Sequence, residues 1–251
     1  MSTLLPWLPF LFAIFLLAGT VKGVVGMGLP TVAMGLLSLR MAPAEAAALL
    51  LLPSLLTNVQ QAATGSALRS LLRRLWPMLL AIAVATLLSA GVIAGQDSRI
   101  AGIGLGALLV IYAAFGLGEW QLPSPGRHER ALGLLAGALT GLATGATGVF
   151  VLPSLPYLVS LHLSREALLQ ALGLAFSAAT LALAVGLARQ HALDAHTLPA
   201  SALALVPTLF GVAIGNRLRA RLPPRLFRRV FFITLALLGA HILWRALATG
   251  A

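Results

Sequence analysis

Lys22 is the residue whose position in this sequence could most directly support binding chemistry. It is the only lysine in the chain and lies in an apolar stretch just before Gly23, Gly26 and Gly28. In a membrane, a charge costs at least about 2.5 kcal/mol unless it reaches the surface or meets a partner. One hypothesis is that Lys22 receives an anionic substrate, assisted by backbone N–H groups at the helix start after Gly28. The alternative is a lysine at a hairpin edge that reaches lipid headgroups.

A second group of polar side chains interrupts the apolar stretch after Pro53. Its members are Ser54, Thr57, Asn58, Gln60 and Gln61. Hydroxyl and amide groups can donate hydrogen bonds to sulfonate or carboxylate oxygens without the permanent attraction of a charge, which allows release. Thr57 and Asn58 are the preferred candidate ligands because they lie deeper, and Gln61 is included with them. The alternative is hydrogen bonding between helices near a proline kink.

The second half of the chain repeats parts of this arrangement without the charge. Thr140 stands where Lys22 stands in the first half, so a site built on Lys22 would be electrostatically one-sided. Ser177 lies in the stretch that matches the polar group around Asn58, with helix packing as the alternative role. The candidate substrate-binding residues of this half are Thr140, Gly141, Gly145, Gly148 and Ser177.

These residues belong to an internal duplication. The offset between matching landmarks runs from 118 residues, for Gly19 and Gly137, to 122 residues, for Pro77 and Pro199. The spacing Gly91-x-x-x-Gly95 likewise reappears as Gly211-x-x-x-Gly215. Such spacings let two helix backbones approach closely, and we assign these glycines no substrate contact. A duplicated apolar chain with glycine-broken segments is typical of membrane transporters.

The composition predicts a membrane protein. Hydrophobic residues make up 59% of the chain and charged residues 9%, whereas a soluble domain carries about 25% charged residues. A membrane-spanning helix needs about 20 residues, and the second and seventh predicted helices are too short. The predicted helices are 4–21, 24–39, 45–66, 75–95, 99–118, 131–146, 148–161, 166–188, 197–216 and 226–247.

The predicted fold is therefore an all-α integral membrane protein with two inverted repeats. Each repeat is a Gly-broken helical hairpin plus three transmembrane helices, with the breaks at 23–28 and 141–148. Five elements per repeat is an odd number, so the second repeat must enter from the opposite face. The predicted units are a first repeat at 1–118, a cytoplasmic linker at 119–130 and a second repeat at 131–251.

The distribution of arginine predicts the orientation. With each hairpin returning to its own face, one face collects twelve arginines, and the other holds Arg40, Arg99, Arg189 and Arg245. Positive residues are enriched on the cytoplasmic side of a membrane, so both termini are expected on the non-cytoplasmic side of a bacterial-type inner membrane. The net charge of +11 is thereby explained without nucleic acid as a partner, and the expected partners are the lipid bilayer and a small anionic substrate. Assembly into a homo-oligomer is left open.

Several kinds of chemistry find no support in the sequence. There is no cysteine, and the histidines lack metal-ligand spacing, so neither a metal nor a cofactor is expected. No phosphate-binding loop for ATP is present, and no acidic residue lies deep in a predicted helix. Transport is therefore expected to be secondary or passive, and the membrane potential alone contributes about 2.3 kcal/mol per charge per 100 mV to anion export.

The glycine pattern resembles that of a known family. The run Gly-x-x-x-Gly-x-x-Gly-x-Gly from Gly19 to Gly28, its partner in the second half and the duplicated layout look like the sulfite exporter TauE/SafE family. The resemblance covers almost the whole chain. It implies an integral membrane protein that moves small anions, notably sulfite and organosulfonates, across the inner membrane. Here Met27 separates Gly26 from Gly28, whereas adjacent glycines are common in the family at this break.

The resulting hypothesis is a transporter that exports sulfite or organosulfur anions by alternating access, and not an enzyme. One alternative is an intramembrane hydrolase with Ser66 as nucleophile, although no histidine is predicted near enough to activate it and no aspartate pair exists. Another alternative is a non-transporting membrane assembly subunit.

Overall fold

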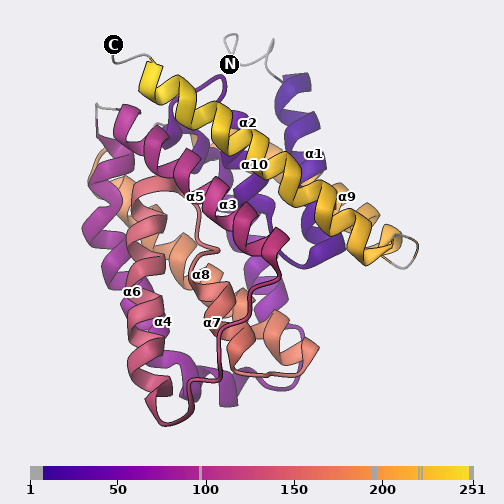
Figure 1. Ribbon diagram of the computed structural model, residues 1–251. Helices are drawn as coiled ribbons and strands as arrows, with labels where there is room; N and C mark the ends of the chain where they lie inside the picture. Colours follow the sequence, from indigo (N-terminus) through magenta and orange to yellow (C-terminus); the bar gives the residue numbers. More distant parts are fainter. Residues whose placement is uncertain (1–7, 96–97, 194–196, 220, 222, 249–251) are drawn as a thin grey trace.

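A computed structural model describes residues 8–95, 98–193, 197–219, 221 and 223–248 (Figure 1). This part of the chain is helical and contains no strand, which confirms the all-α prediction. The helices are α1 (Leu8–Val25), α2 (Leu29–Leu37), α3 (Pro43–Ala63), α4 (Leu68–Ala94), α5 (Ser98–Gly118), the short 3-10 helix η2 (Gly126–His128), α6 (Glu129–Thr147), α7 (Ser154–Ser160), α8 (Arg165–Arg189), α9 (Thr197–Leu218) and α10 (Pro224–Ala248).

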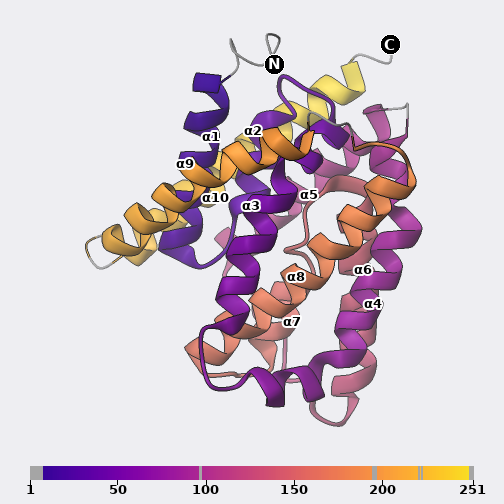
Figure 2. The same cartoon turned by 180° about the vertical axis from the view of Figure 1, so that it is seen from behind.

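The helices pair in the same way in both halves. Helix α1 packs along α9, and its counterpart α6 packs along α4. Helices α3 and α8 pack against each other, as do α5 and α10. Figure 1 shows α4 and α6 side by side at one edge and α10 crossing the molecule diagonally, and Figure 2 shows α8 and α9 from behind. Each of these eight helices therefore packs on a partner from the other half, while the inverted relation of the halves stays a prediction.

Helix α4 begins at Leu68, whereas the sequence predicted a start at 75. Leu71 and Leu75 are buried, while Arg73 and Arg74 between them are exposed. This is the pattern of an amphipathic helix, in which the charges face outward and the leucines one turn apart face the core. The prediction was wrong here because the arginines were taken as a loop between apolar segments.

The first glycine break is shorter than predicted. Helix α1 continues through Lys22 and Gly23 to Val25, so the break starts only at Gly26. Gly26 and Gly28 have φ angles of 85° and 98°, in the left-handed region that favours glycine. Gly23 lies within the helix, and a Cβ at this position would lie 2.4 Å from the carbonyl oxygen of Val212 on α9. Its role is close packing of helices.

The second break also starts later in the chain than predicted. Helix α6 continues through Gly141 and Gly145 to Thr147, and Gly148, with φ 72°, ends it. The chain then runs without helix until α7 begins at Ser154, whereas the prediction started this helix at 148. The first break therefore runs from Gly26 to Gly28 and the second starts at Gly148, while Gly23, Gly141 and Gly145 belong to helices.

The duplicated Gly-x-x-x-Gly spacings do not play equal roles. A Cβ at Gly211 would lie 2.3 Å from the carbonyl oxygen of Leu16, and one at Gly215 would lie 2.2 Å from that of Thr20. These two glycines allow close contact between α9 and α1, as predicted. Gly91 instead faces the end of the Gln190 side chain, and Gly95 lies near its own helix. The prediction of close helix approach was therefore wrong for the first-half pair.

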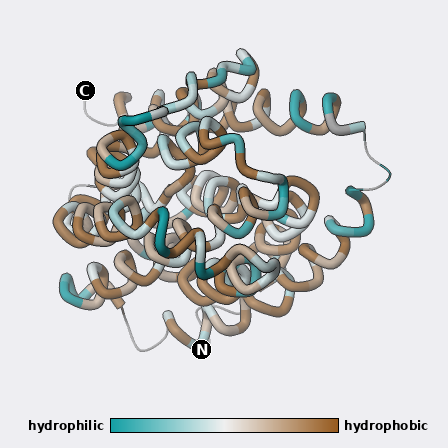
Figure 3. The backbone as a smooth tube through the Cα atoms, turned by 90° about the horizontal axis from the view of Figure 1, so that it is seen from below, coloured by the Kyte–Doolittle hydropathy of each residue, from teal (hydrophilic) through white to brown (hydrophobic). Residues whose placement is uncertain are grey.

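The outer surface of the molecule is apolar. Large hydrophobic side chains such as Leu88, Leu237 and Phe210 are exposed, and Figure 3 shows hydrophobic residues on the outward sides of the helices as well as between them. An exposed surface of this kind suits lipid rather than water. Seven helices in the described ranges are long and apolar enough to cross a membrane, namely α1, α3, α4, α5, α8, α9 and α10.

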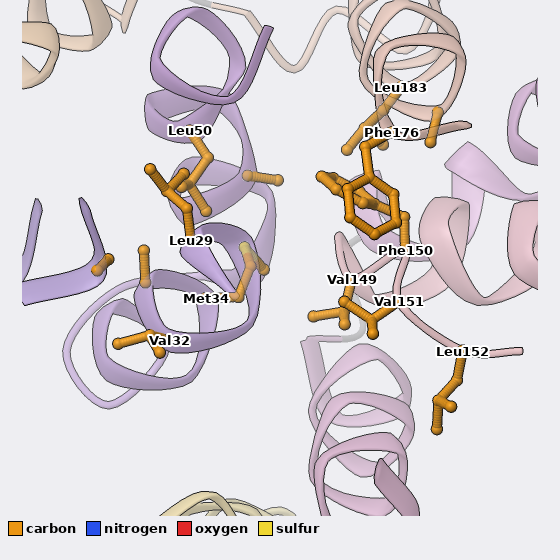
Figure 4. Close-up of a cluster of buried hydrophobic side chains, with 14 of the residues drawn as sticks. Leu29, Val32, Met34, Leu50, Val149, Phe150, Val151, Leu152, Phe176 and Leu183 are labelled. Atoms are coloured by element: carbon orange, nitrogen blue, oxygen red, sulfur yellow. The ribbon is translucent and has the colours of Figure 1, made fainter. Parts of the chain in front are cut away.

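A buried apolar layer separates the two hairpins near the middle of the molecule. Figure 4 shows Leu29 and Met34 of the first hairpin near Leu50 of α3, with Phe150 and Phe176 of the second half opposite them. The rings of Phe150 and Phe176 lie 4.9 Å apart between centroids, and both side chains are buried. We call this layer, defined by these five residues, the apolar plug.

Candidate functional site

Lys22 lies inside the protein. Its exposed fraction is 5%, although it carries the only ammonium group on a side chain. The Nζ donates a hydrogen bond to Oδ1 of Asn58, which is fully buried on α3. The alternative in which Lys22 reaches lipid headgroups is therefore wrong for this structure. Helix α1 places the side chain inward because it continues past Lys22 instead of breaking before it.

The Lys22–Asn58 pair still has unused hydrogen-bond donors. A lysine ammonium has three N–H groups, and the bond to Asn58 accounts for one of them. The amide Nδ2 of Asn58 is buried and has no hydrogen-bond partner in the part of the chain that the structure describes. Unused donors in a buried place are costly unless a ligand or water accepts from them. The pair therefore presents a positive, donor-rich point that suits the oxygens of an anion.

No carboxylate neutralises this positive charge in the described part of the chain. The ion pairs found there are Arg74–Glu129 and Arg228–Glu119, and neither involves Lys22. A buried charge is usually paired or hydrogen-bonded, because burial without compensation is very costly. Among the described residues, the Lys22 ammonium has only the neutral oxygen of Asn58 as its partner, so an anion would complete its surroundings.

Helix α8 brings Gly26 and Gln61 near this pair. Leu169 of α8 lies so close to Gly26 that a Cβ there would come within 2.5 Å of the leucine side chain. The Nε2 of Gln61 donates a 2.8 Å hydrogen bond to the carbonyl oxygen of Leu169. Gln61 thus joins α3 to α8, which is the structural alternative considered from the sequence. This bond uses one of the two N–H donors of its amide.

The other candidates of the first half lie nearby with different roles. The Thr57 hydroxyl donates to the carbonyl oxygen of Pro53 at 2.7 Å. The carbonyl that the helical proline leaves without its N–H partner is that of Leu49, and it accepts a 2.8 Å hydrogen bond from Ser201 of α9. Gly28 caps the start of α2 in a left-handed conformation. Ser177, on α8, has a buried hydroxyl without a partner. Gly173, one turn before it, packs on the carbonyl of Asn58, so Ser177 belongs to the face of α8 that meets α3.

Most second-half candidates lie elsewhere. A Cβ at Gly141 would meet the carbonyl oxygen of Ile82 at 2.4 Å, and one at Gly145 would meet the hydroxyl of Ser89 at 2.1 Å. These glycines form the contact between α6 and α4. The Thr140 hydroxyl donates to Ala136 of its own helix at 2.7 Å. The structure therefore does not join these residues to the Lys22–Asn58 pair.

Gly148 is the second-half candidate that meets the first hairpin. A Cβ there would lie 3.0 Å from the end of Met34 in the apolar plug. Gly148 also lines a cavity of about 10 Å³ together with Pro30, Ser54 and Thr180. This volume is about that of one water. The Ser54 hydroxyl beside it is buried and has no partner, so the space between the two breaks is closed to anything larger than a water molecule.

A much larger cavity opens beside the first break, and we call it the vestibule. Its volume is about 620 Å³, and Val24 and Val25 at the end of α1 and Met27 of the break form part of its wall. The remaining wall comes from the end of α5, residues 119–122, Leu152, α7, the start of α8, Arg219 and the start of α10. The vestibule therefore reaches α1 within two residues of Lys22.

The vestibule is positively charged. Arg165, Arg219 and Arg228 line it, against the single acidic residue Glu119. Glu119 pairs with Arg228, and neither Arg165 nor Arg219 has a carboxylate partner in the described ranges. Burial, and to a smaller extent the charge of Arg165, lowers the pKa of Arg219 below its ordinary value. An anion in the vestibule would offset the positive charge of these two arginines.

A family model for the sulfite exporters TauE/SafE matches residues 11–242, nearly the whole chain. The chain belongs to the TauE/SafE family. Neither the curated proteins nor the solved structures gave a match. Membership makes this protein a membrane transporter that crosses the membrane several times, in agreement with the seven candidate spans. It also places the chain outside the hydrolases, so the alternative with Ser66 as nucleophile falls away.

For this TauE/SafE family member, the sequence did not single out the vestibule as part of the site. Its arginines entered only as markers of membrane orientation, and its aromatic residues were not considered. The spacing of Phe227, Phe231 and Phe232 on one helix could have indicated an aromatic face near Arg228. The joining of that face to the first break depends on how distant helices pack, which no local pattern shows.

Proposed function

We propose that this TauE/SafE family member is a secondary or passive transporter that exports small anions, sulfite or an organosulfur anion, by alternating access between two inverted halves. The buried Lys22 carries this proposal. Its hydrogen-bond partner is a neutral amide, and no described carboxylate pairs with it. An anion is the ligand that such a site lacks. Transporters with inverted repeats commonly place the substrate between the halves, next to broken helices.

We propose that the anion path runs past the two hairpin breaks, with the Lys22 site beside the first of them. The vestibule reaches the first break from one side. Beyond it, the apolar plug and the small cavity at Ser54 leave no continuous passage. At the other end of the α5–α10 pair lies a second cavity of about 400 Å³, lined by Arg40, Arg99 and Arg245. We propose that the plug opens toward this second cavity when the vestibule closes.

The proposed orientation places the vestibule on the cytoplasmic side of a bacterial-type inner membrane. Its arginines belong to the arginine-rich face, and the positive-inside rule assigns that face to the cytoplasm. Helix α1 begins and α10 ends at the opposite end of the molecule (Figure 1), so both termini would lie outside. The inside-negative potential then drives an anion from the vestibule outward with about 2.3 kcal/mol per charge per 100 mV.

Flux measurements on the full-length protein in proteoliposomes test this proposal. Sulfite, thiosulfate, methanesulfonate and benzenesulfonate are offered under an imposed membrane potential to wild type and to Lys22→Gln. We expect potential-driven flux of at least one of these anions, reduced at least about tenfold in Lys22→Gln, a change of ~1.4 kcal/mol.

Arg189→Gln is the matched control, because it also removes one positive charge but lies exposed at the end of α8. It should retain the wild-type flux. The proposal fails if a folded Lys22→Gln protein transports as fast as wild type, or if wild type moves none of the four anions.

A further inference from the structure

The start of α4 presents arginines and large hydrophobic side chains together on the outside of the molecule. Leu71 and Leu75 face the core, whereas five residues around them are exposed: Leu68, Arg69, Leu72, Arg73 and Trp76. We call these five residues the outer face of α4. Residues three or four apart lie on the same side of a helix, so Arg69, Arg73 and Trp76 point in nearly the same direction.

The outer face continues directly into the membrane-spanning part of α4. Leu72, Trp76 and Leu80 follow one another at a spacing of four residues, and Trp76 is 59% exposed. A row of exposed apolar side chains of this kind needs hydrocarbon around it. Tryptophan is enriched where the hydrocarbon of a membrane meets the headgroups. Arg69 and Arg73, before Trp76 in the chain, therefore lie at the level of the headgroups.

The backbone that begins α4 is held in a fixed position by α8. The buried side chain of Gln170 accepts a hydrogen bond from the N–H of Ala67 and donates hydrogen bonds to the carbonyl oxygens of Ala62 and Gly65. Pro77 lacks the N–H that would continue the helical hydrogen bonds. Figure 2 shows the first turns of α4 crossing the lower end of the molecule before the helix turns upward. The outer face thus belongs to a bent segment that is tied to the rest of the protein.

The positive charge of the outer face is not neutralised by the described part of the protein. Arg74, on the side toward α6, donates to both carboxylate oxygens of Glu129 at 2.6 and 2.8 Å. Arg69 and Arg73 have no carboxylate partner among the described residues. A guanidinium group presents N–H donors in a planar fork that matches the oxygens of a phosphate. The outer face therefore suits a phosphate that is attached to hydrocarbon.

We infer that the outer face of α4 is a binding site for an anionic phospholipid such as phosphatidylglycerol. Arg69 and Arg73 hold the phosphate, and Leu72 and Trp76 lie against the first carbons of the acyl chains. A free anion would leave the apolar row uncovered, and a zwitterionic lipid would bring its own positive group toward the arginines. The inference does not depend on which anion the protein transports.

Native mass spectrometry of the full-length protein in a neutral detergent tests the inference by counting the lipids that stay bound. Phosphatidylglycerol and phosphatidylcholine with the same acyl chains are titrated. We expect the first phosphatidylglycerol to bind at least about tenfold tighter than phosphatidylcholine, because only its headgroup has a net negative charge. Glycerol 3-phosphate, which has the phosphate without the chains, should bind at least about tenfold more weakly than phosphatidylglycerol.

A pair of double variants locates the binding. Arg69→Gln/Arg73→Gln should weaken phosphatidylglycerol binding at least about fivefold through the loss of charge-assisted hydrogen bonds. Arg225→Gln/Arg229→Gln is the matched control, because it removes two exposed arginines with the same spacing at the start of α10. It should bind within about twofold of wild type, since those charges are remote and screened. Thermal unfolding without lipid checks the fold, and the two single variants replace Arg69→Gln/Arg73→Gln if it does not fold.

Fluorescence quenching places the lipid beside Trp76. Phosphatidylglycerol brominated on its acyl chains should quench the tryptophan fluorescence of the wild type more than brominated phosphatidylcholine does. This excess quenching should disappear in Trp76→Phe, which keeps an aromatic ring at the same position but removes the indole.

Three results would overturn the inference. Phosphatidylglycerol could bind no tighter than phosphatidylcholine. Both double variants could lose the same affinity, which would show attraction by overall charge and no site on α4. Glycerol 3-phosphate could bind as tightly as phosphatidylglycerol, which would identify a site for free phosphate.

Discussion

Lys22 and Asn58 define the site at the scale of single residues. One is the only lysine of the chain, and the other is a buried amide that accepts its hydrogen bond and keeps its own Nδ2 unpartnered. A positive group held by a neutral oxygen keeps its charge available to a ligand. A carboxylate in place of the amide would compete with the anion for that charge. The amide at position 58 is therefore part of the proposed function.

Asn58→Asp tests this role with almost no change in shape. The new carboxylate would pair with Lys22 and neutralise it, so we expect a folded protein whose potential-driven anion flux falls at least about tenfold. Proteoliposome flux measures the effect, and thermal unfolding in detergent checks the fold. Gln60→Glu makes the same chemical change on the exposed side of α3 and is the matched control. Flux equal to wild type in a folded Asn58→Asp protein would show that the Lys22 charge is not the anion site.

Both residues could be predicted from the sequence, but the hydrogen bond between them could not. Lys22 was identifiable because it is a lone charge in an apolar stretch, and Asn58 because amides are rare in membrane helices. The two lie on different helices that only the packed structure brings together. The duplication predicted that Thr140 lies beside the site. In the structure its hydroxyl instead donates a hydrogen bond to the Ala136 carbonyl oxygen of its own helix. Equivalent positions in a repeat need not keep equivalent surroundings.

At the scale of elements, the glycines determine which helices can touch. Gly19 and Gly211 let the backbones of α1 and α9 approach, and Gly137 and Gly141 do the same for α6 and α4. Without a hydrophobic driving force between helices in lipid, such close approach supplies much of the packing energy. The two spacings Gly91-x-x-x-Gly95 and Gly211-x-x-x-Gly215 look identical in sequence, but only the second lies against another helix backbone.

Alanine substitutions should separate the two spacings. In Gly211→Ala the new Cβ would lie 2.3 Å from the carbonyl oxygen of Leu16, so α1 and α9 must move apart; overpacking of this kind costs about 1–3 kcal/mol. In Gly91→Ala the nearest group is the flexible end of Gln190 at 3.4 Å, and alanine favours a helix by about 0.5–1 kcal/mol over glycine.

Thermal unfolding of both variants in the same detergent measures this difference. Gly211→Ala should melt below wild type, and Gly91→Ala should melt at or above it. Equal destabilisation of the two variants would contradict the packing described for α4.

Most elements could be predicted from the sequence because apolar length and glycine or proline interruptions are local signals. All ten predicted helices are present, with errors at their ends. Helix α4 extends through its arginines because those residues face outward beside a leucine stripe. Helices α1 and α6 continue through several glycines because a neighbouring helix fills the space that a side chain would occupy. Such tertiary contacts cannot be read from local sequence.

At the scale of the whole molecule, two arginine-lined cavities lie at opposite ends of the α5–α10 pair. A small cavity lined by the plug residues Leu50 and Phe150 holds no more than a water molecule. This arrangement suits a transporter whose path is open to one side at a time. The family match shows that the protein is a membrane transporter. The direction of transport and the helices that move are part of the proposed function.

The most direct test of an anion path through Lys22 is the electrical current carried by the protein itself. Full-length protein in vesicles on a solid-supported membrane is exposed to a rapid jump in sulfite or benzenesulfonate at constant pH and constant cation concentration. We expect a transient current with the sign of negative charge entering the vesicles. It should be reduced at least about tenfold in Lys22→Gln and retained in Arg189→Gln. Absence of a current above that of protein-free vesicles with either anion, or a current of the opposite sign, would contradict it.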